Sequence, residues 1–284
     1  MLNPMDRVAT FGRRFARALE RGFIFRGTRF TNLPERLWLL GRWVELRYPS
    51  DQTILSDVIN VILEDEYGLL ELKKPIRTIV DIGANVGLFS IWARHCFPSA
   101  KILAFEPNPF VFEFAEGNTK DMAIMLFAEA VAAESGSADI LLSGSSRTAR
   151  VAKKAEGPLK IVSFDEVLER SGGEIDLLKM DCEGGEWDIF KSVKAFQNVA
   201  YVAMEYHLDS QHSLEDLLGI SERLGFRIVH LQENQGFGVA WMEKSRGEAA
   251  DVRLMAYRQV NQVTHGRIAC SVAIPDFARS IFCV

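Results

Sequence analysis

The sequence predicts an α/β protein built on a mostly parallel, doubly wound sheet. From residue 77 onward, short apolar runs rich in β-branched residues alternate with amphipathic helical segments. A glycine-containing turn follows the first of these runs, and acidic residues follow several others. Ligands of such sheets bind beyond the carboxyl ends of the strands, so those ends are where a site is expected.

Seven strands are expected, with helices between them. The strands are Arg77–Ile82, Lys101–Phe105, Ile124–Ala132, Ile175–Met180, Val199–Met204, Phe226–Leu231 and Val252–Tyr257. The helices are Leu88–Phe97, Pro109–Gly117, Gly185–Phe196 and Ser213–Leu224. A long connection joins the last two strands, and Ala138–Leu142 with Leu159–Val162 predict an inserted hairpin around the loop Ser143–Arg147.

Residues 1–75 are expected to form an N-terminal helical and cap extension, and residues 76–284 the catalytic domain. A helix is predicted over residues 5–21, where an apolar stripe alternates with arginines. This basic arm could contact an anionic membrane or a partner, or it could pack on the core or on a second subunit, giving a homodimer. Ser56–Glu64 predicts a helix, leading into Glu66–Gly68, that covers the ligand cleft.

Composition excludes several classes of protein. The net charge of −5 argues against bulk nucleic-acid binding. No apolar run approaches the ~20 residues of a transmembrane segment, and charges interrupt the N-terminus where a signal peptide would be apolar. The four cysteines lack paired spacing, so reduced thiols and a cytoplasmic location are expected.

The turn after the first strand indicates an adenosine-containing ligand. Gly83 and Gly87 allow a tight turn and a close backbone approach. Asp81 would repel a pyrophosphate but suits the cationic amino-acid end of S-adenosylmethionine. Glu106 ends the second strand, where a carboxylate can accept hydrogen bonds from both ribose hydroxyls.

Four motifs resemble the FkbM family of S-adenosylmethionine-dependent methyltransferases. They are VDIGANVGLFS (80–90), AFEPNP (104–109), SFDEVL (163–168) and LKMDCEGGE (178–186). The resemblance implies a Rossmann-like class I methyltransferase fold with a seven-stranded sheet, and O-methylation of a small-molecule hydroxyl, on a sugar or natural product. The donor-site residues it implies are Asp81, Gly83, Asn85, Gly87, Glu106, Pro107 and Asn108, with Glu129, at the end of the third strand, beside the adenine.

The fourth strand is expected to end in the catalytic residues. Methylation of an alcohol needs an aligned acceptor and a base for its proton. Asp181 is the first candidate for the base, Lys179 could orient Asp181 or the acceptor, and Glu183 lies beside them. His207 is the rival base because its reference pKa lies near neutrality.

Alternative functions remain open at this point. No metal is expected, but a Mg²⁺-dependent O-methyltransferase of the same fold, with Asp181 and Glu205 as ligands, is an alternative; Tyr206 argues against it by standing where a neutral amide ligand is wanted. An RNA methyltransferase and a non-catalytic adenosyl-ligand module are further alternatives. The acceptor pocket is expected from residues 31–75, the Ser143–Arg147 loop and the segment after His207.

Overall fold

The computed structural model describes most of the chain between residues 12 and 245. It covers residues 33–49, 54–141, 150–153 and 157–245, together with residue 12 and the short pieces 15–23, 25–26 and 29–30. The predictions for Ser143–Arg147, for Val252–Tyr257, for Cys270 and for Cys283 lie outside these residues. Cys96 and Cys182 are free thiols. Within the described residues, no helix is both long and apolar enough to cross a bilayer.

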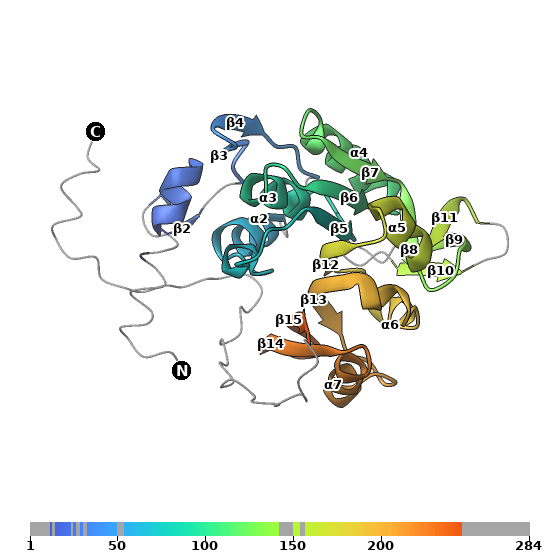
Figure 1. Cartoon of the computed structure of the whole chain (residues 1–284). Coiled ribbons are helices and arrows are strands. Elements are labelled where there is room, and N and C mark those ends of the chain that lie inside the picture. Colours follow the sequence, from blue (N-terminus) through green and yellow to red (C-terminus); the bar gives the residue numbers. More distant parts are fainter. Residues whose placement is uncertain are drawn as a thin grey trace, which may run out of the picture.

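The centre of the molecule is a seven-stranded sheet in the order β14-β15-β13-β12-β5-β6-β7 (Figure 1). The strands β5 (Thr78–Ile82), β6 (Lys101–Phe105), β7 (Ile124–Phe127), β12 (Ile175–Met180) and β13 (Val199–His207) pair in parallel. The strand β15 (Phe237–Lys244) runs antiparallel between β13 and β14 (Phe226–Glu233). The predicted mostly parallel, doubly wound sheet is confirmed.

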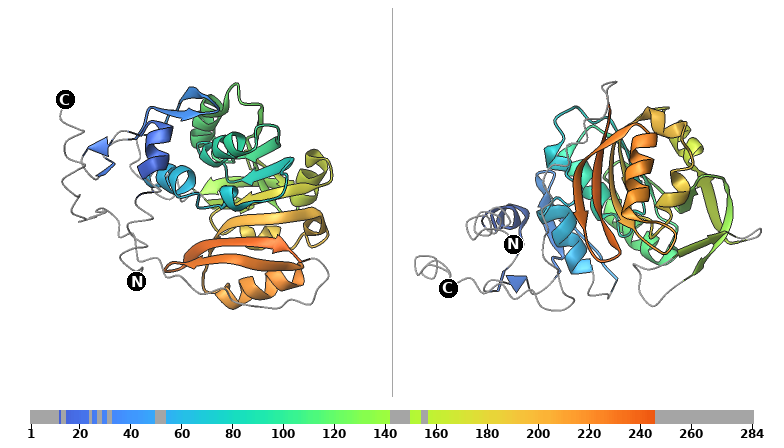
Figure 2. Two further views of the ribbon diagram at one scale, coloured as in Figure 1. Left: turned by 60° about the vertical axis from the view of Figure 1, so that its left-hand side comes forward. Right: turned by 90° about the horizontal axis from the view of Figure 1, so that it is seen from below.

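Alternation along the strands creates a core on each face of the sheet. On one face, Ile79 packs with α2 (Ile54–Val58), the π-helical turn Ile59–Leu63, α3 (Leu88–Cys96) and α4 (Pro109–Thr119). On the other face, Val80 packs with α5 (Phe164–Ser171), α6 (Glu186–Ile189) and α7 (Leu214–Arg223). The view from below in Figure 2 shows the sheet between these helical layers.

The N-terminal extension packs on the first of these cores. Residues 15–21 are helical, and Ala18 is buried in that core, whereas Leu19 is half exposed. Arg17 donates a hydrogen bond to the carbonyl of Leu63. The extension also contains the hairpin of β3 (Arg36–Leu39) and β4 (Arg42–Glu45), and the two-residue strands β1 (Phe25–Arg26) and β2 (Arg29–Phe30).

Three predicted elements differ from the structure. The run Ile124–Ala132 divides into β7 and β8 (Glu129–Ala132), because the chain leaves β6 after Phe127 and pairs with β11 instead. The helix predicted over Gly185–Phe196 stops at Ile189 and continues as turns and a 3₁₀ segment, Ala195–Asn198. This path places the Phe190 and Phe196 rings 5.6 Å apart in the core.

The last strand of the sheet is the third difference. Among the described residues it is β15, which follows β14 after the short turn at residues 234–236, so a strand occupies part of the long connection expected there. A separate four-stranded sheet, in the order β10-β9-β11-β8, lies beside β7 (Figure 1). It contains the predicted hairpin pairing between β9 (Gly136–Leu141) and β11 (Leu159–Ser163), and adds β10 (Arg150–Lys153).

Candidate active site

The loop after β5 lies directly against the end of β12. Gly83 has a φ of +79°, and a Cβ at this position would come within 1.8 Å of the Asp181 carbonyl oxygen. The amides of Gly83 and Ala84 donate to the Phe105 carbonyl at the end of β6. Only glycine fits this contact, so the loop and the fourth-strand carboxylate occupy one site.

Asp81 belongs to β5, is fully buried just before that loop and already has a cationic partner. Its Oδ1 lies 3.1 Å from Lys179 Nζ, and its Oδ2 accepts a 2.7 Å hydrogen bond from Ser90. Lys179 also donates to the carbonyl of Gly83 at 2.6 Å. Burial alone would lower the pKa of Lys179, but attraction to Asp81 and Asp181 outweighs burial and raises it. Asp81 therefore fixes the loop, and its direct contact with a cationic ligand stays a prediction.

Glu106 is the buried carboxylate that ends β6. Its two oxygens accept backbone hydrogen bonds from Asn85 at 2.7 Å and from Asn108 at 2.8 Å. Burial raises the pKa of Glu106 to about 7, although these two hydrogen bonds act in the opposite direction. Asn85 has a φ of +51°, and its buried Oδ1 makes no hydrogen bond within the described residues. The two residues thus offer acceptor oxygens at the loop, as a hydroxyl-rich ligand such as ribose requires.

The remaining predicted donor-site residues divide into two groups. Gly87 lies at the N-cap of α3 with a φ of +87°. Asn108 caps α4 because its side chain accepts a hydrogen bond from the Phe110 amide. Pro107 lies half-buried between Glu106 and Asn108. Glu129 instead begins β8, in the second sheet, rather than ending the third strand. Its carboxylate forms ion pairs with Arg170 and Lys160. Contact between Glu129 and adenine stays a prediction.

Asp181 follows β12, and its side chain is held by the distant Tyr67 and by Lys179 of β12 itself. Its Oδ2 accepts a 3.1 Å hydrogen bond from the Tyr67 hydroxyl and lies 3.9 Å from Lys179 Nζ. The Tyr67 ring packs edge-on against Phe89, 5.3 Å between centroids. Burial and the nearby Asp181 charge raise the pKa of Tyr67 well above its usual value, which keeps it a hydrogen-bond donor. The Asp181 side chain is 29% exposed, so it remains accessible to an acceptor.

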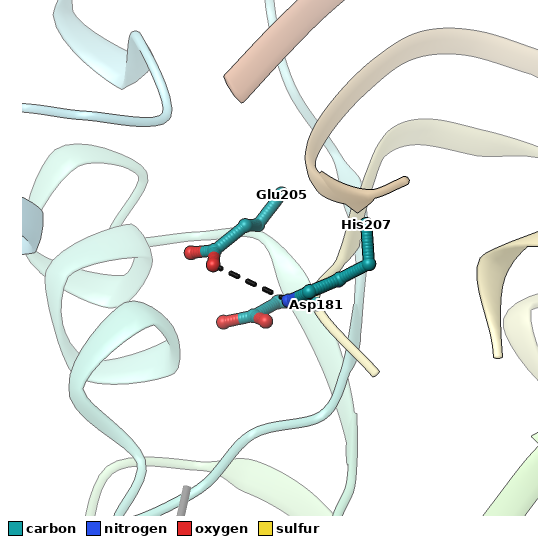
Figure 3. Close-up of side chains that lie close together, drawn as sticks. All are labelled: Asp181, Glu205 and His207. Atoms are coloured by element: carbon teal, nitrogen blue, oxygen red, sulfur yellow. Dashed lines mark ion pairs between the residues drawn. The ribbon is translucent and has the colours of Figure 1, made fainter. Parts of the chain in front are cut away.

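His207 lies among carboxylates at the end of β13. Its Nε2 is 3.5 Å from Glu183 Oε2 and 3.5 Å from Glu205 Oε1, and its Nδ1 is 3.5 Å from Glu186 Oε1. Figure 3 shows the ring pointing between the carboxylates of Glu205 and Asp181. Burial would lower the pKa of His207, but attraction to the carboxylates of Glu186 and Glu205 outweighs burial and raises the pKa to about 11. A ring that holds its proton so tightly is a poor base at neutral pH, which favours Asp181 for that role.

The strand β13 is longer than predicted, and this length creates the cluster. It continues through His207, which pairs with Phe237 of β15. Glu205 and His207 therefore lie two positions apart on one face of a strand, while Tyr206 is buried on the other face and donates to the Gln232 carbonyl.

Two site residues were not identified from the sequence. Tyr67 belongs to the segment predicted to cover the cleft, yet no pattern marks its hydroxyl as a partner of Asp181. Ser90 closes the VDIGANVGLFS motif, and its position in the first turn of α3, nine residues after Asp81, is the signal that could have identified it.

The fold and this site define a class I methyltransferase. The methyltransferase FkbM domain matches residues 81–228, more than half of the chain. The chain belongs to the FkbM methyltransferase family.

Two relatives and one solved structure show the range of similarity. A hexuronic acid methyltransferase, AglP, from Haloferax volcanii is 27% identical over 190 residues, covering 64% of this chain and 74% of AglP. The methyltransferase sdnD from Sordaria araneosa is 52% identical over 40 residues, covering 14% of this chain and 15% of sdnD. The precorrin-6y C5,15-methyltransferase of Geobacter metallireducens has a TM-score of 0.40 at 14% identity, covering 72% of this chain and 93% of that one.

Proposed function

We propose that this protein is an S-adenosylmethionine-dependent O-methyltransferase acting on a hydroxyl of a small molecule, with a sugar acid as the favoured acceptor. The contact between Gly83 and the Asp181 carbonyl carries this proposal. It brings the loop expected to bind the methyl donor against the carboxylate expected to receive the acceptor's proton. The hexuronic acid named for AglP supports the choice of acceptor.

The described residues fit the methyl donor. Glu106 offers carboxylate oxygens for ribose hydroxyls, and the Asn85 Oδ1 lacks a hydrogen-bond partner within the described residues. When bound, S-adenosylmethionine supplies a methyl group activated by its sulfonium charge.

The chain's own residues then have separate tasks. Tyr67 and Lys179 hold one oxygen of Asp181, which orients the carboxylate toward the acceptor hydroxyl. Asp181 would accept the acceptor's hydroxyl proton while the methyl group passes from the donor's sulfur, whose bond to it breaks, to the acceptor's oxygen. Lys179 contacts both Asp81 and the Gly83 carbonyl. It therefore holds the donor loop in a fixed position relative to the proposed base, Asp181.

The proposed function includes the location of the protein and the kind of molecule it binds. We expect a cytoplasmic protein whose acceptor is a small molecule rather than nucleic acid. Assembly into a homodimer through the N-terminal extension stays a prediction.

Transfer of tritium from labelled S-adenosylmethionine tests the proposal. We expect label in glucuronic or galacturonic acid, free or within oligosaccharides, and none in total RNA. Asp181→Asn should lose transfer while its affinity for S-adenosylhomocysteine stays unchanged, and Asp176→Asn, at the other end of β12, serves as a control for folding. Label confined to RNA, or full transfer by Asp181→Asn, would contradict the proposal.

A further inference from the structure

Three side chains at the ends of β12 and β13 have the geometry of a cation site. Asp181, Glu205 and His207 each offer a ligand atom, and these atoms all lie within 4.8 Å of one another (Figure 3). All three residues are partly exposed, so a cation could reach them from solvent. We propose that they bind one small divalent cation of the Mg²⁺ or Mn²⁺ class.

The surroundings of His207 support a metal-binding role. Metal-ligating histidines commonly direct their second ring nitrogen at a carboxylate, which fixes the ring. Here Nδ1 faces Glu186 Oε1 at 3.5 Å, and that oxygen is itself held by the Cys182 amide at 2.9 Å. Glu186 is completely buried, and its second oxygen makes no hydrogen bond within the described residues. Glu186 is not one of the three ligands, and its buried carboxylate lies where it would hold the His207 ring in place for metal binding.

Charge in this region also favours a cation. Two cationic side chains, Lys179 and His207, face five carboxylates: Asp81, Asp181, Glu183, Glu186 and Glu205. Lys179 is closer to Asp81 than to Asp181, at 3.1 Å against 3.9 Å. Carboxylates packed this closely repel one another, and a bound divalent ion would reduce that repulsion.

The donor set indicates which ion would bind. Carboxylate oxygens suit Mg²⁺ and Mn²⁺, and an imidazole nitrogen adds affinity for the transition metal. Adjacent ligands in an octahedral Mg²⁺ site lie about 3 Å apart, so the three side chains, whose ligand atoms lie within 4.8 Å of one another, must draw together around the ion. His207 must release its proton to bind, so the cation and the proton compete for the ring.

This inference departs from the metal-free site expected from the sequence. The sequence indicates only two candidate ligands, Asp181 and Glu205. The longer β13 adds His207 as a third ligand. Only the purpose of the cation rests on the proposed function. The ion would position the acceptor hydroxyl and favour loss of its proton. Binding of the cation itself is independent of methyl transfer.

Manganese binding to the full-length, EDTA-treated protein tests the inference. The electron paramagnetic resonance signal of free Mn²⁺ measures binding, with Mg²⁺ added as competitor. We expect one Mn²⁺ per chain, with affinity lowered roughly tenfold or more in Glu205→Gln and in His207→Gln. Glu222→Gln, an exposed change on α7 with the same loss of charge, should bind as wild type.

The outcomes separate the two proposals. Binding that Glu205→Gln weakens supports the cation site, provided its melting curve matches that of Glu222→Gln. Absence of Mn²⁺ binding by the wild type, or equal binding by a folded Glu205→Gln, overturns it. If methyl transfer survives EDTA while Asp181→Asn abolishes it, Asp181 acts as the base without the cation, so the role of the cation in transfer is overturned and the proposed function stands.

Discussion

Lys179 Nζ lies 3.1 Å from Asp81 Oδ1, and the two residues are direct neighbours across β12 and β5. Both side chains are almost completely buried, with Lys179 3% and Asp81 0% exposed. Lys179 also bonds the Gly83 carbonyl and approaches Asp181, so one cation links the first strand, its loop and the fourth strand. The glycine turn and the acidic strand end are therefore parts of one buried polar network.

Removing this cation should destabilise the fold strongly. Lys179→Met leaves Asp81 buried without its ion-pair partner, which costs about 3–5 kcal/mol. Urea denaturation measures the free energy of unfolding. The control is Lys74→Met, because Lys74 forms a solvent-exposed ion pair with Glu243 that contributes less than about 1 kcal/mol. Equal stability of the two variants would contradict the account of the network.

Adding one methyl group at Gly83 should have a comparable effect. Gly83→Ala combines a left-handed φ with overlap against the backbone of Asp181, so we expect a loss of more than about 3 kcal/mol. Gly117→Ala, within α4, meets no atom within 4 Å and should be neutral or stabilising by up to about 1 kcal/mol. If the denaturation curves of the two alanine variants coincide, the loop at Gly83 does not lie in close contact with the backbone of Asp181.

Tyr67 should affect turnover rather than donor binding. Tyr67→Phe removes the hydrogen bond to Asp181, and bonds to charged groups contribute about 1.5–3 kcal/mol. We expect kcat for methyl transfer to fall roughly tenfold or more, with unchanged affinity for S-adenosylhomocysteine. Tyr201→Phe removes a longer 3.3 Å bond to Glu243 away from the site and should retain wild-type kcat. A Tyr67→Phe enzyme as fast as this control would exclude a positioning role.

Donor affinity should depend on pH through Glu106. Its pKa of about 7 in the free protein means that a fraction of the carboxyl is protonated near neutrality. Ribose hydroxyls donate to the ionised form, so binding must release the proton and weakens as the pH falls below 7. S-adenosylhomocysteine should therefore bind about tenfold more weakly at pH 6 than at pH 8.

Isothermal titration calorimetry in buffers of different ionisation enthalpy measures both affinity and proton release. Glu106→Gln cannot titrate, so its weaker binding should vary little over this range. A wild-type affinity that is flat from pH 6 to pH 8 would show that Glu106 is already fully ionised before the donor binds.

The regular part of the fold follows from the sequence because periodicity reports burial. Strands such as β5, β6 and β12 are apolar on both faces, and their bounds agree with the predicted runs to within a residue. Periodicity does not report the partner of a strand. Ile124–Ala132 reads as one run, although its two halves pair with β6 and β11. For the same reason Glu129 was placed at the end of the wrong strand.

The candidate site was predictable where chemistry is local to a motif. Asp81, Gly83, Glu106 and Asp181 meet at the carboxyl ends of the strands as expected. Contacts between distant segments were not predictable. Tyr67 reaches Asp181 across 114 positions of sequence, and the cluster around His207 depends on how far β13 extends beside β15.

We infer that the methyl donor binds where β5 and β6 end, with the Glu106 carboxylate accepting hydrogen bonds from the ribose hydroxyls. Calorimetric titration of S-adenosylhomocysteine at pH 8 into wild type, Glu106→Ala and Glu113→Ala tests it most directly, since Glu113 is an exposed glutamate on α4. We predict binding to wild type and Glu113→Ala with equal affinity, and binding at least about tenfold weaker to Glu106→Ala. No binding to the wild type, or equal affinity in Glu106→Ala, would contradict the account.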